Sequence, residues 1–129
     1  LKNDALLNFL RQRCPHSQVT MSVCTGSALL AKAGLLDGLA ATSHKMFFEL
    51  ARSQGDKVDW QESARWVDAG QYVTSSGVSA GTDMALAVIE RVFDAELAEQ
   101  VMNYTEYQWH RDADRDPFAQ LLNQGALPG

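Results

Sequence analysis

Apolar and polar residues recur along the chain with two different periods, and the two periods predict helices alternating with strands. Residues 4–13 place apolar side chains on one narrow helical face, whereas residues 19–23 form a short run of strand-forming residues. The Ala- and Leu-rich segment 25–33 predicts a helix that ends at Gly34, because glycine accepts the left-handed turn that often follows a last helical turn.

The second half of the chain continues the alternation. The predicted elements are a turn at 35–38, a strand at 39–43, a helix at 45–53 that Gly55 ends, a hairpin of 64–68 and 71–75 around Ala69-Gly70, a helix at 79–93, a helix that Asp94 caps and that runs to 107, and a loop from 112 onward. Strands that alternate with helices predict an α/β domain with a mostly parallel sheet covered on both faces.

Composition and charge narrow the class of protein. The 129 residues suit one domain, 1–129, and the opening without a Met directly into a helix suggests the C-terminal portion of a larger fold. The net charge of −5 without a cluster of Lys and Arg argues against nucleic acid or an anionic membrane as partner. Neither a membrane span nor a signal peptide is recognisable, so we expect a cytoplasmic protein with free thiols at its two cysteines.

Cys24 is the strongest candidate for chemistry. It stands where a predicted strand ends and a helix begins at once, with small residues behind it. Such a sharp turn would hold the residue in a strained conformation with its sulfur exposed, and the amides of Thr25 and Gly26 at the helix start would point toward the sulfur or an oxyanion. The helix dipole would lower the pKa of the thiol. The alternative is an ordinary buried cysteine, since free cysteines are often buried, and the residues alone leave both interpretations open.

Several motifs in a fixed order resemble one known family. SVCTGSALLAKAGLL (22–36), DGLAATSH (37–44), YVTSSGVSAGTDMAL (72–86) and TEYQWHRDADRDPFA (105–119) resemble the DJ-1/PfpI (ThiJ/PfpI) superfamily, and within it the branch of isocyanide hydratase and its AraC-type regulator relatives. The resemblance implies a flavodoxin-like three-layer α/β sandwich, similar to class I glutamine amidotransferases and usually dimeric.

The resemblance also implies roles for particular residues. Cys24 falls on the nucleophile, and Thr25 on the position whose amide helps to bind an oxyanion. The substrate-binding positions are Gly26, His44, Gly77, Val78 and Ser79. A strand-end histidine such as His44 is more often structural, so its place at the pocket edge follows from the resemblance alone.

Two departures from the family patterns bear on function. Thr25 replaces the His that follows the cysteine in PfpI-type proteases, which disfavours protease activity, and Lys45 replaces the Trp usual after the ATTH His of the hydratases. The family's carboxylate partner of the cysteine is expected before Leu1. Among other residues, Asp83 is expected to stabilise a helix start and Cys14 to be inert.

Three functions follow from these features. The first is a cysteine enzyme that adds water to an isocyanide and forms an N-formamide. The alternatives are a ligand-sensing domain related to AraC-type regulators and a redox protein of the DJ-1 kind, in which Cys24 would be oxidised selectively. We expect a small-molecule substrate and a homodimer, with no metal and no cofactor, because the sequence has no Walker pattern, dinucleotide fingerprint or zinc spacing.

Overall fold

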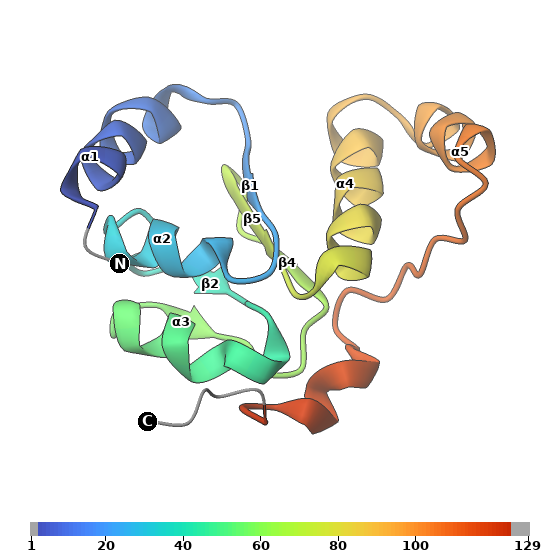
Figure 1. Ribbon diagram of the computed structural model, residues 1–129. Coiled ribbons are helices and arrows are strands. Elements are labelled where there is room, and N and C mark those ends of the chain that lie inside the picture. Colours follow the sequence, from blue (N-terminus) through green and yellow to red (C-terminus); the bar gives the residue numbers. More distant parts are fainter. Residues whose placement is uncertain (1–2, 125–129) are drawn as a thin grey trace.

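The computed structural model describes residues 3–124, and Figure 1 labels their helices and strands. The elements are α1 (Asp4–Arg13), η1 (Cys14–His16), β1 (Thr20–Ser22), α2 (Gly26–Lys32), β2 (Ala40–Ala41), η2 (Lys45–Phe47), α3 (Phe48–Gln54), β3 (Asp59–Trp60), β4 (Trp66–Asp68), β5 (Tyr72–Ser75), α4 (Val78–Val92), α5 (Ala95–Tyr104) and η3 (Pro117–Leu121), where η marks a 3-10 helix. The predicted helices and hairpin are confirmed, with most boundaries shifted by one or two residues.

The strands form two small sheets rather than the one sheet that the pattern predicted. In the larger sheet β5 lies between β1 and β4, parallel to β1 and antiparallel to β4. In the smaller sheet β2 and β3 pair in parallel over two residues. The two sheets are linked where the Thr42 amide donates to the Thr74 hydroxyl at 2.9 Å. Most pairings are therefore parallel, as expected, and they bring the ends of β1, β2 and β5 together.

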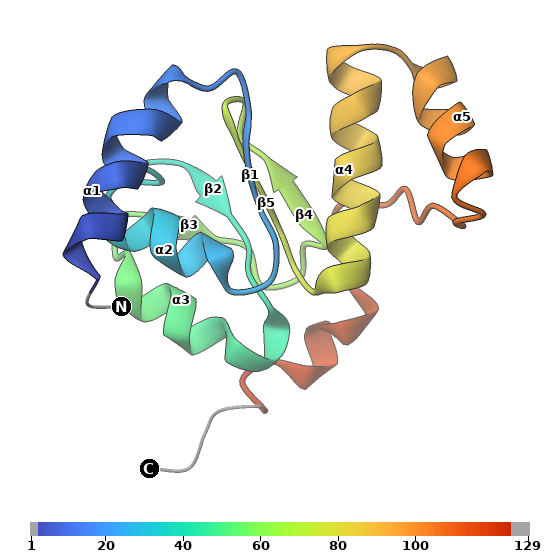
Figure 2. The ribbon, with the colours of Figure 1, turned by 45° about the horizontal axis from the view of Figure 1, so that its top comes forward.

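Helices cover the strands from both sides and produce three layers. Figures 1 and 2 show α1, α2 and α3 on one side of the strands and α4 and α5 on the other. One core cluster, which includes Leu30, Leu36 and Ala41, packs under the first group. A second cluster of Trp66, Val73, Met84 and Val88 packs under α4. Burial of these apolar faces is the main favourable term for such a fold.

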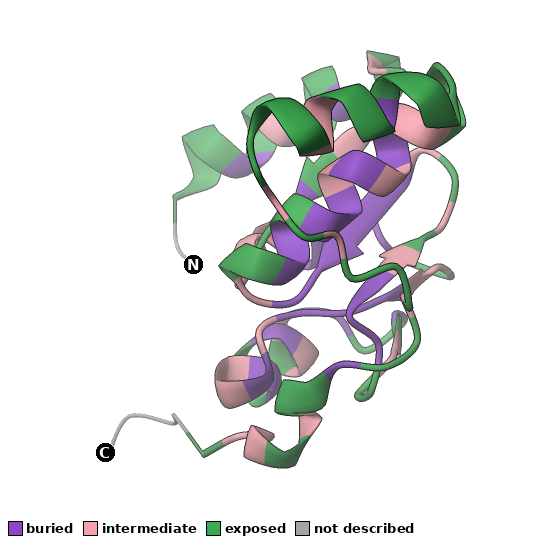
Figure 3. Ribbon diagram, turned by 90° about the vertical axis from the view of Figure 1, so that its right-hand side faces the viewer, coloured by how far each residue is buried: buried purple, intermediate pink, exposed green. Residues whose placement is uncertain are grey.

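The two outer helices differ in how they are buried. Figure 3 shows α4 with its buried residues toward the strands, whereas α5 is exposed along most of its length and buries only Ala98. The side chain of Asp94 caps α5 by accepting from the Leu97 amide at 2.7 Å, as predicted. No helix within residues 3–124 has both the length and the apolar character needed to cross a membrane.

The segment after α5 is not the simple loop that the sequence predicted. Its polypeptide returns beneath the start of α4, and the Ala113 carbonyl accepts from the Arg65 amide at 2.6 Å. It then forms η3, which Asp116 caps by accepting from the Phe118 amide at 3.0 Å. Finally the Asn123 amide donates to the Lys45 carbonyl at 2.7 Å. We call residues 111–124 the strap, because both of its ends are tied to the body of the domain.

Candidate functional site around Cys24

Cys24 occupies a sharp turn between β1 and α2, as the sequence predicted. Its φ of 58° lies in the left-handed region, which costs a non-glycine residue about 1–2 kcal/mol. The turn is fixed by three hydrogen bonds: the Cys24 amide donates to the Ser76 carbonyl at 2.7 Å, and the Cys24 carbonyl accepts from the Ser43 hydroxyl at 3.0 Å and the His44 amide at 3.3 Å. The cost of the strained backbone is therefore offset by contacts from two other loops.

The sulfur of Cys24 is half-buried, and this burial raises the pKa of its thiol. The prediction of a lowered pKa is wrong for two physical reasons. The helix that follows is short, only Gly26–Lys32, so its dipole is small, and no cation within residues 3–124 opposes the effect of burial on this pKa. The geometry of the predicted turn is therefore present, but these residues do not stabilise a thiolate.

The two amides expected beside the sulfur differ. The Gly26 amide donates to the Val23 carbonyl at 3.0 Å, so it is already occupied. The Thr25 amide makes no hydrogen bond with a described residue, which leaves it available for a ligand oxygen. Gly26 also lies against β1, since a Cβ added at Gly26 would lie 3.4 Å from the Cβ of Ser22.

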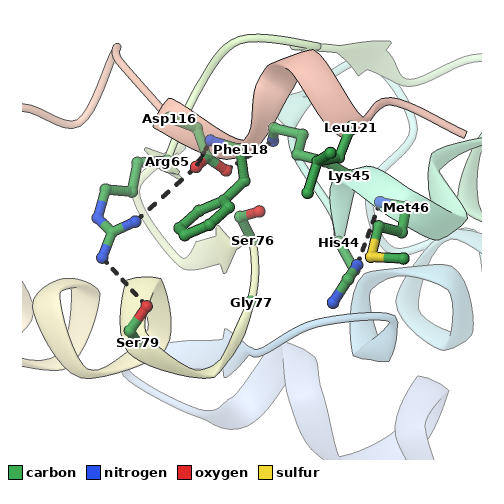
Figure 4. A pocket seen from close by; sticks show the side chains of 10 residues that line it. All are labelled: His44, Lys45, Met46, Arg65, Ser76, Gly77, Ser79, Asp116, Phe118 and Leu121. Atoms are coloured by element: carbon green, nitrogen blue, oxygen red, sulfur yellow. Dashed lines mark hydrogen bonds and ion pairs between the residues drawn. The ribbon is translucent and has the colours of Figure 1, made fainter. Parts of the chain in front are cut away.

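A pocket of about 280 Å³ adjoins this turn, and Figure 4 shows its side chains. Ser76 and His44, whose backbones hold Cys24, are both part of its wall. The complete lining is His44, Lys45, Met46, Arg65, Ser76, Gly77, Ser79, Asp116, Phe118 and Leu121. The volume lies at the lower end of the range for small-molecule pockets, so the pocket suits a compact ligand.

Three of the predicted substrate-binding residues lie together in this pocket. His44, Gly77 and Ser79 line it, and a Cβ at Gly77 would come within 4.0 Å of His44 Nε2. The turn before α4 therefore passes next to the imidazole, at a distance that a Cβ would also allow. The Nδ1 atom of His44 accepts from the Met46 amide at 3.2 Å, which fixes the orientation of the ring. The other predicted site residues, Cys24, Thr25, Gly26 and Val78, are not part of the pocket lining, and Val78 is 74% exposed.

The wall also contains buried charges that the sequence analysis missed. Lys45 is 1% exposed, and its Nζ donates to the Ala64 carbonyl at 2.6 Å and to the Thr42 hydroxyl at 2.7 Å. It lies 3.7 Å from an Asp116 oxygen. Burial, opposed by Asp116, lowers the pKa of Lys45 to about 8.

Arg65 connects this lysine pair to α4. Its guanidinium binds Asp83 at 2.7 Å, lies 3.8 Å from Asp116 and donates to the Ser79 hydroxyl at 3.4 Å. Asp83 is fully buried and also accepts from the His110 amide at 3.0 Å. The prediction that Asp83 stabilises a helix start is therefore wrong, and we call Lys45, Arg65, Asp83 and Asp116 the ionic network.

The other titratable candidates are simpler. Cys14 is buried, in agreement with an inert thiol, and His16 and His110 are exposed. Residues 3–124 contain no group of three His, Cys, Asp or Glu side chains that could hold a metal ion. The strained turn at Cys24 and the unoccupied Thr25 amide are features that nucleophilic attack by sulfur on a small ligand would use.

Comparison with known proteins places this site in a family. The family described as DJ-1/PfpI matches residues 1–91. Isonitrile hydratase of Pseudomonas putida is 32% identical over 107 residues, which are 83% of this chain and 46% of that protein. The HTH-type transcriptional regulator CdhR of Pseudomonas aeruginosa is 32% identical over 97 residues, covering 75% of this chain and 29% of the regulator. This chain therefore spans less than half the length of these curated relatives.

A solved structure agrees with the sequence comparison. A ThiJ/PfpI family protein from Pseudomonas syringae has a TM-score of 0.68 at 33% identity, over 89% of this chain and 44% of that one. The shared fold is the flavodoxin-like α/β fold that the motifs implied. With the strained cysteine between β1 and α2 and a family match over most of its length, this chain belongs to the DJ-1/PfpI family.

Proposed function

We propose that Cys24 is the nucleophile of a reaction like that of isonitrile hydratase, in which water is added to an isonitrile (an isocyanide) to form an N-formamide. The observation that carries the proposal is the positive φ of Cys24 beside a compact pocket. A residue type that rarely adopts this conformation persists there only when the surroundings enforce it, and such strain gathers at functional sites. The 32% identity to isonitrile hydratase supports the choice of reaction.

The proposed reaction has two steps. The Cys24 sulfur bonds to the terminal carbon of R–N≡C while a proton is delivered to that carbon, which gives the thioimidate R–N=CH–S. Water then adds to this carbon, the nitrogen takes up a proton, and the C–S bond breaks to release R–NH–CHO and the thiol. The Thr25 amide, which has no hydrogen-bond partner among the described residues, would donate to the oxygen of the tetrahedral intermediate, which is the role of an oxyanion site.

Because the pKa of the thiol is raised, the reaction also needs a base. A base must remove the proton from sulfur, because the thiolate and not the thiol is the nucleophile. Our candidate for this base is the carboxylate partner that the family resemblance implies, and this chain covers 46% of the hydratase. Close approach of a carboxylate would keep the thiol protonated until substrate binds, so base and nucleophile would act as a pair.

The test is to incubate the purified protein with an alkyl isocyanide and to measure the N-formamide by NMR. We expect formamide with the unchanged protein and with Cys14→Ser, and none with Cys24→Ser. Cys14 is the matched control because it is the other free thiol and is buried away from the pocket. Formamide formation that survives Cys24→Ser would refute the proposal.

A second candidate is a ligand-sensing domain of a transcriptional regulator, since the HTH-type transcriptional regulator CdhR is among the relatives. The observation that favours it is a compact pocket beside a thiol whose pKa burial raises, because a sensor needs the pocket but not a reactive thiolate. In that case a ligand would bind equally well to the protein and to Cys24→Ser, without any product being formed.

A further inference from the structure

The cations in the pocket wall already have carboxylate partners. Lys45 lies 3.7 Å from Asp116, which is also in the wall, and Arg65 binds Asp83, which lies behind the wall, at 2.7 Å. These four residues are all buried, and Lys45 also has two oxygen partners within 2.7 Å. A charged ligand would compete with these existing pairs and would gain little attraction, whereas removing its charge from water is costly. The wall therefore favours a neutral ligand.

The apolar part of the wall comes partly from the strap. Figure 4 shows Phe118 extending from η3 toward Ser76, with Leu121 on the same segment and Met46 across the pocket. Phe118 is 51% exposed, so its ring lies at the mouth rather than inside a packed core. A ring at the mouth of a small pocket limits the size of the group that can enter.

The position of this ring is fixed by the ionic network. Asp116, two residues before Phe118, accepts from the Phe118 amide at 3.0 Å with one carboxylate oxygen. The same carboxylate faces Arg65 and Lys45, and the Asp116 amide donates to the Ser63 carbonyl at 2.8 Å. The start of η3 is thereby held against the domain, and Phe118 has a defined place above the pocket.

We infer that this pocket receives the compact apolar substituent of a neutral electrophile that Cys24 attacks, and that Phe118 sets the upper size of that substituent. Asp116 is a positioning residue in this arrangement, because it acts through Phe118. The inference rests on the proposed role of Cys24 as nucleophile and does not depend on hydration of an isonitrile. It is testable by any neutral electrophile that is offered with substituents of different size.

N-alkylmaleimides are such probes, because the thiol adds across their C=C bond and the substituent varies independently of the reacting carbons. Rates of Cys24 modification by N-methylmaleimide and N-cyclohexylmaleimide would be measured by peptide mass spectrometry, each divided by the rate with free glutathione. We expect a methyl-to-cyclohexyl preference of about tenfold, the scale at which small pockets discriminate by size. Phe118→Ala should reduce the preference several-fold, and Phe118→Trp should increase it.

The matched control is Phe93→Ala, since Phe93 is 68% exposed and does not line the pocket. Its preference should equal that of the unchanged protein. Circular dichroism would confirm that the variants fold, and Phe118→Trp keeps the test valid if the alanine variant does not. An unchanged preference in both Phe118 variants would overturn the inference.

Two further comparisons test the charge of the ligand and distinguish the pocket inference from the hydratase proposal. An N-(2-carboxyethyl)maleimide that reacts with Cys24 faster than N-propylmaleimide, after the same normalisation, would overturn the neutral class of ligand. If no formamide forms while the Phe118 variants shift the maleimide preference, then the hydratase proposal fails and the pocket inference stands. If formamide forms but the Phe118 variants do not shift the maleimide preference, then the hydratase proposal stands and the pocket inference fails.

Discussion

The turn at Cys24, which adjoins the pocket through Ser76 and His44, and the ionic network, which forms part of the pocket wall, are built differently. The turn is made by residues adjacent in sequence, from β1 to α2, and its partners are backbone groups and one uncharged hydroxyl. The network joins four charged side chains from η2, the residue before β4, α4 and the strap. The turn should therefore respond to changes in backbone freedom and steric fit, and the network to changes in charge. Variants of the turn and of the network should therefore distinguish these two responses.

Removal of the Asp116 charge should have the largest effect on stability. Asp116→Asn leaves the buried Lys45 without a carboxylate partner, while Arg65 keeps Asp83, and breaking a buried pair in this way costs about 3–5 kcal/mol. Urea unfolding followed by circular dichroism would measure the free energy of unfolding. Asp114→Asn is the control, because Asp114 is exposed and forms no ion pair within residues 3–124. Equal stability of the two variants would show that the network does not hold the strap.

A steric change beside the turn should have the next largest effect. A Cβ at Gly81 would lie 2.8 Å from Cγ1 and 2.9 Å from Cγ2 of Val23, the residue before Cys24. Gly81→Ala must therefore displace α4 or Val23, and overpacking of this kind costs about 1–3 kcal/mol. The reaction of Cys24 with N-methylmaleimide should slow as well, since the turn moves with Val23.

A double-mutant cycle tests the cause of this steric loss. Val23→Ala removes both atoms that the new methyl group would meet, so the double variant Gly81→Ala, Val23→Ala should recover most of the stability lost in Gly81→Ala. Additive losses in the cycle would place the effect elsewhere in α4.

The difference between the two regions also explains which of them the sequence could predict. The turn depends on a strand, a cysteine and small helix-forming residues in immediate succession, and these are visible in one window. Its strained φ was correctly expected from that pattern. The direction of the Cys24 pKa was not, because it depends on which charges the fold brings near, and none of those in residues 3–124 pairs with the sulfur.

The network was missed because its members are far apart in sequence. Lys and Arg are almost always exposed unless paired, so nothing in the sequence predicted that Lys45 and Arg65 are buried. Nothing local to either residue identifies Asp116 or Asp83 as its partner. One signal was available in the tail, since Asp116-Pro117 is a typical start of a helical turn and indicated structure in the region interpreted as loop.

In the fold, too, features that depend on local sequence were predicted and features that depend on tertiary contacts were not. The helices and the hairpin were predicted because each repeats its own period over many residues. Strand β3 was missed, since Asp59–Trp60 is too short to show alternation, and its pairing with β2 is decided by tertiary structure. The split into two sheets follows from such short strands, because β2 and β3 each contribute only two paired residues.

A smaller effect should separate strain from side-chain chemistry at the turn. Cys24→Ala keeps the penalty of a Cβ at a φ of 58°, whereas Cys24→Gly removes it. The glycine variant should therefore be more stable than the alanine variant by about 1 kcal/mol, the opposite of the usual order of these two residues. Thermal and urea unfolding would measure the difference. A more stable alanine variant would show that the turn is not strained in the native protein.

The smallest predicted effect is a dependence of stability on pH that comes from the charge of Lys45 in the network and not from the turn. The pKa of Lys45 is about 8 in the folded state against an ordinary 10.5, so between these values the unfolded chain binds a proton that the folded chain has released. Stability from this group must then rise with pH, by about 1 kcal/mol between pH 7.5 and 9. Burial raises the pKa values of the Cys24, Tyr72 and Tyr107 groups, and these acids oppose the rise at higher pH.

The measurement is therefore best made in a Cys24→Ser background, which removes the lowest-titrating of the three opposing acids. The free energy of unfolding of this protein should increase from pH 7.5 to 9, and the increase should disappear when Lys45→Met is added. Because the methionine variant also leaves Asp116 facing Arg65 alone, its stability at every pH should be lower, but without the slope. A slope that persists without Lys45 would assign the pH dependence to another group and leave the charge of the buried lysine without a role in holding the strap.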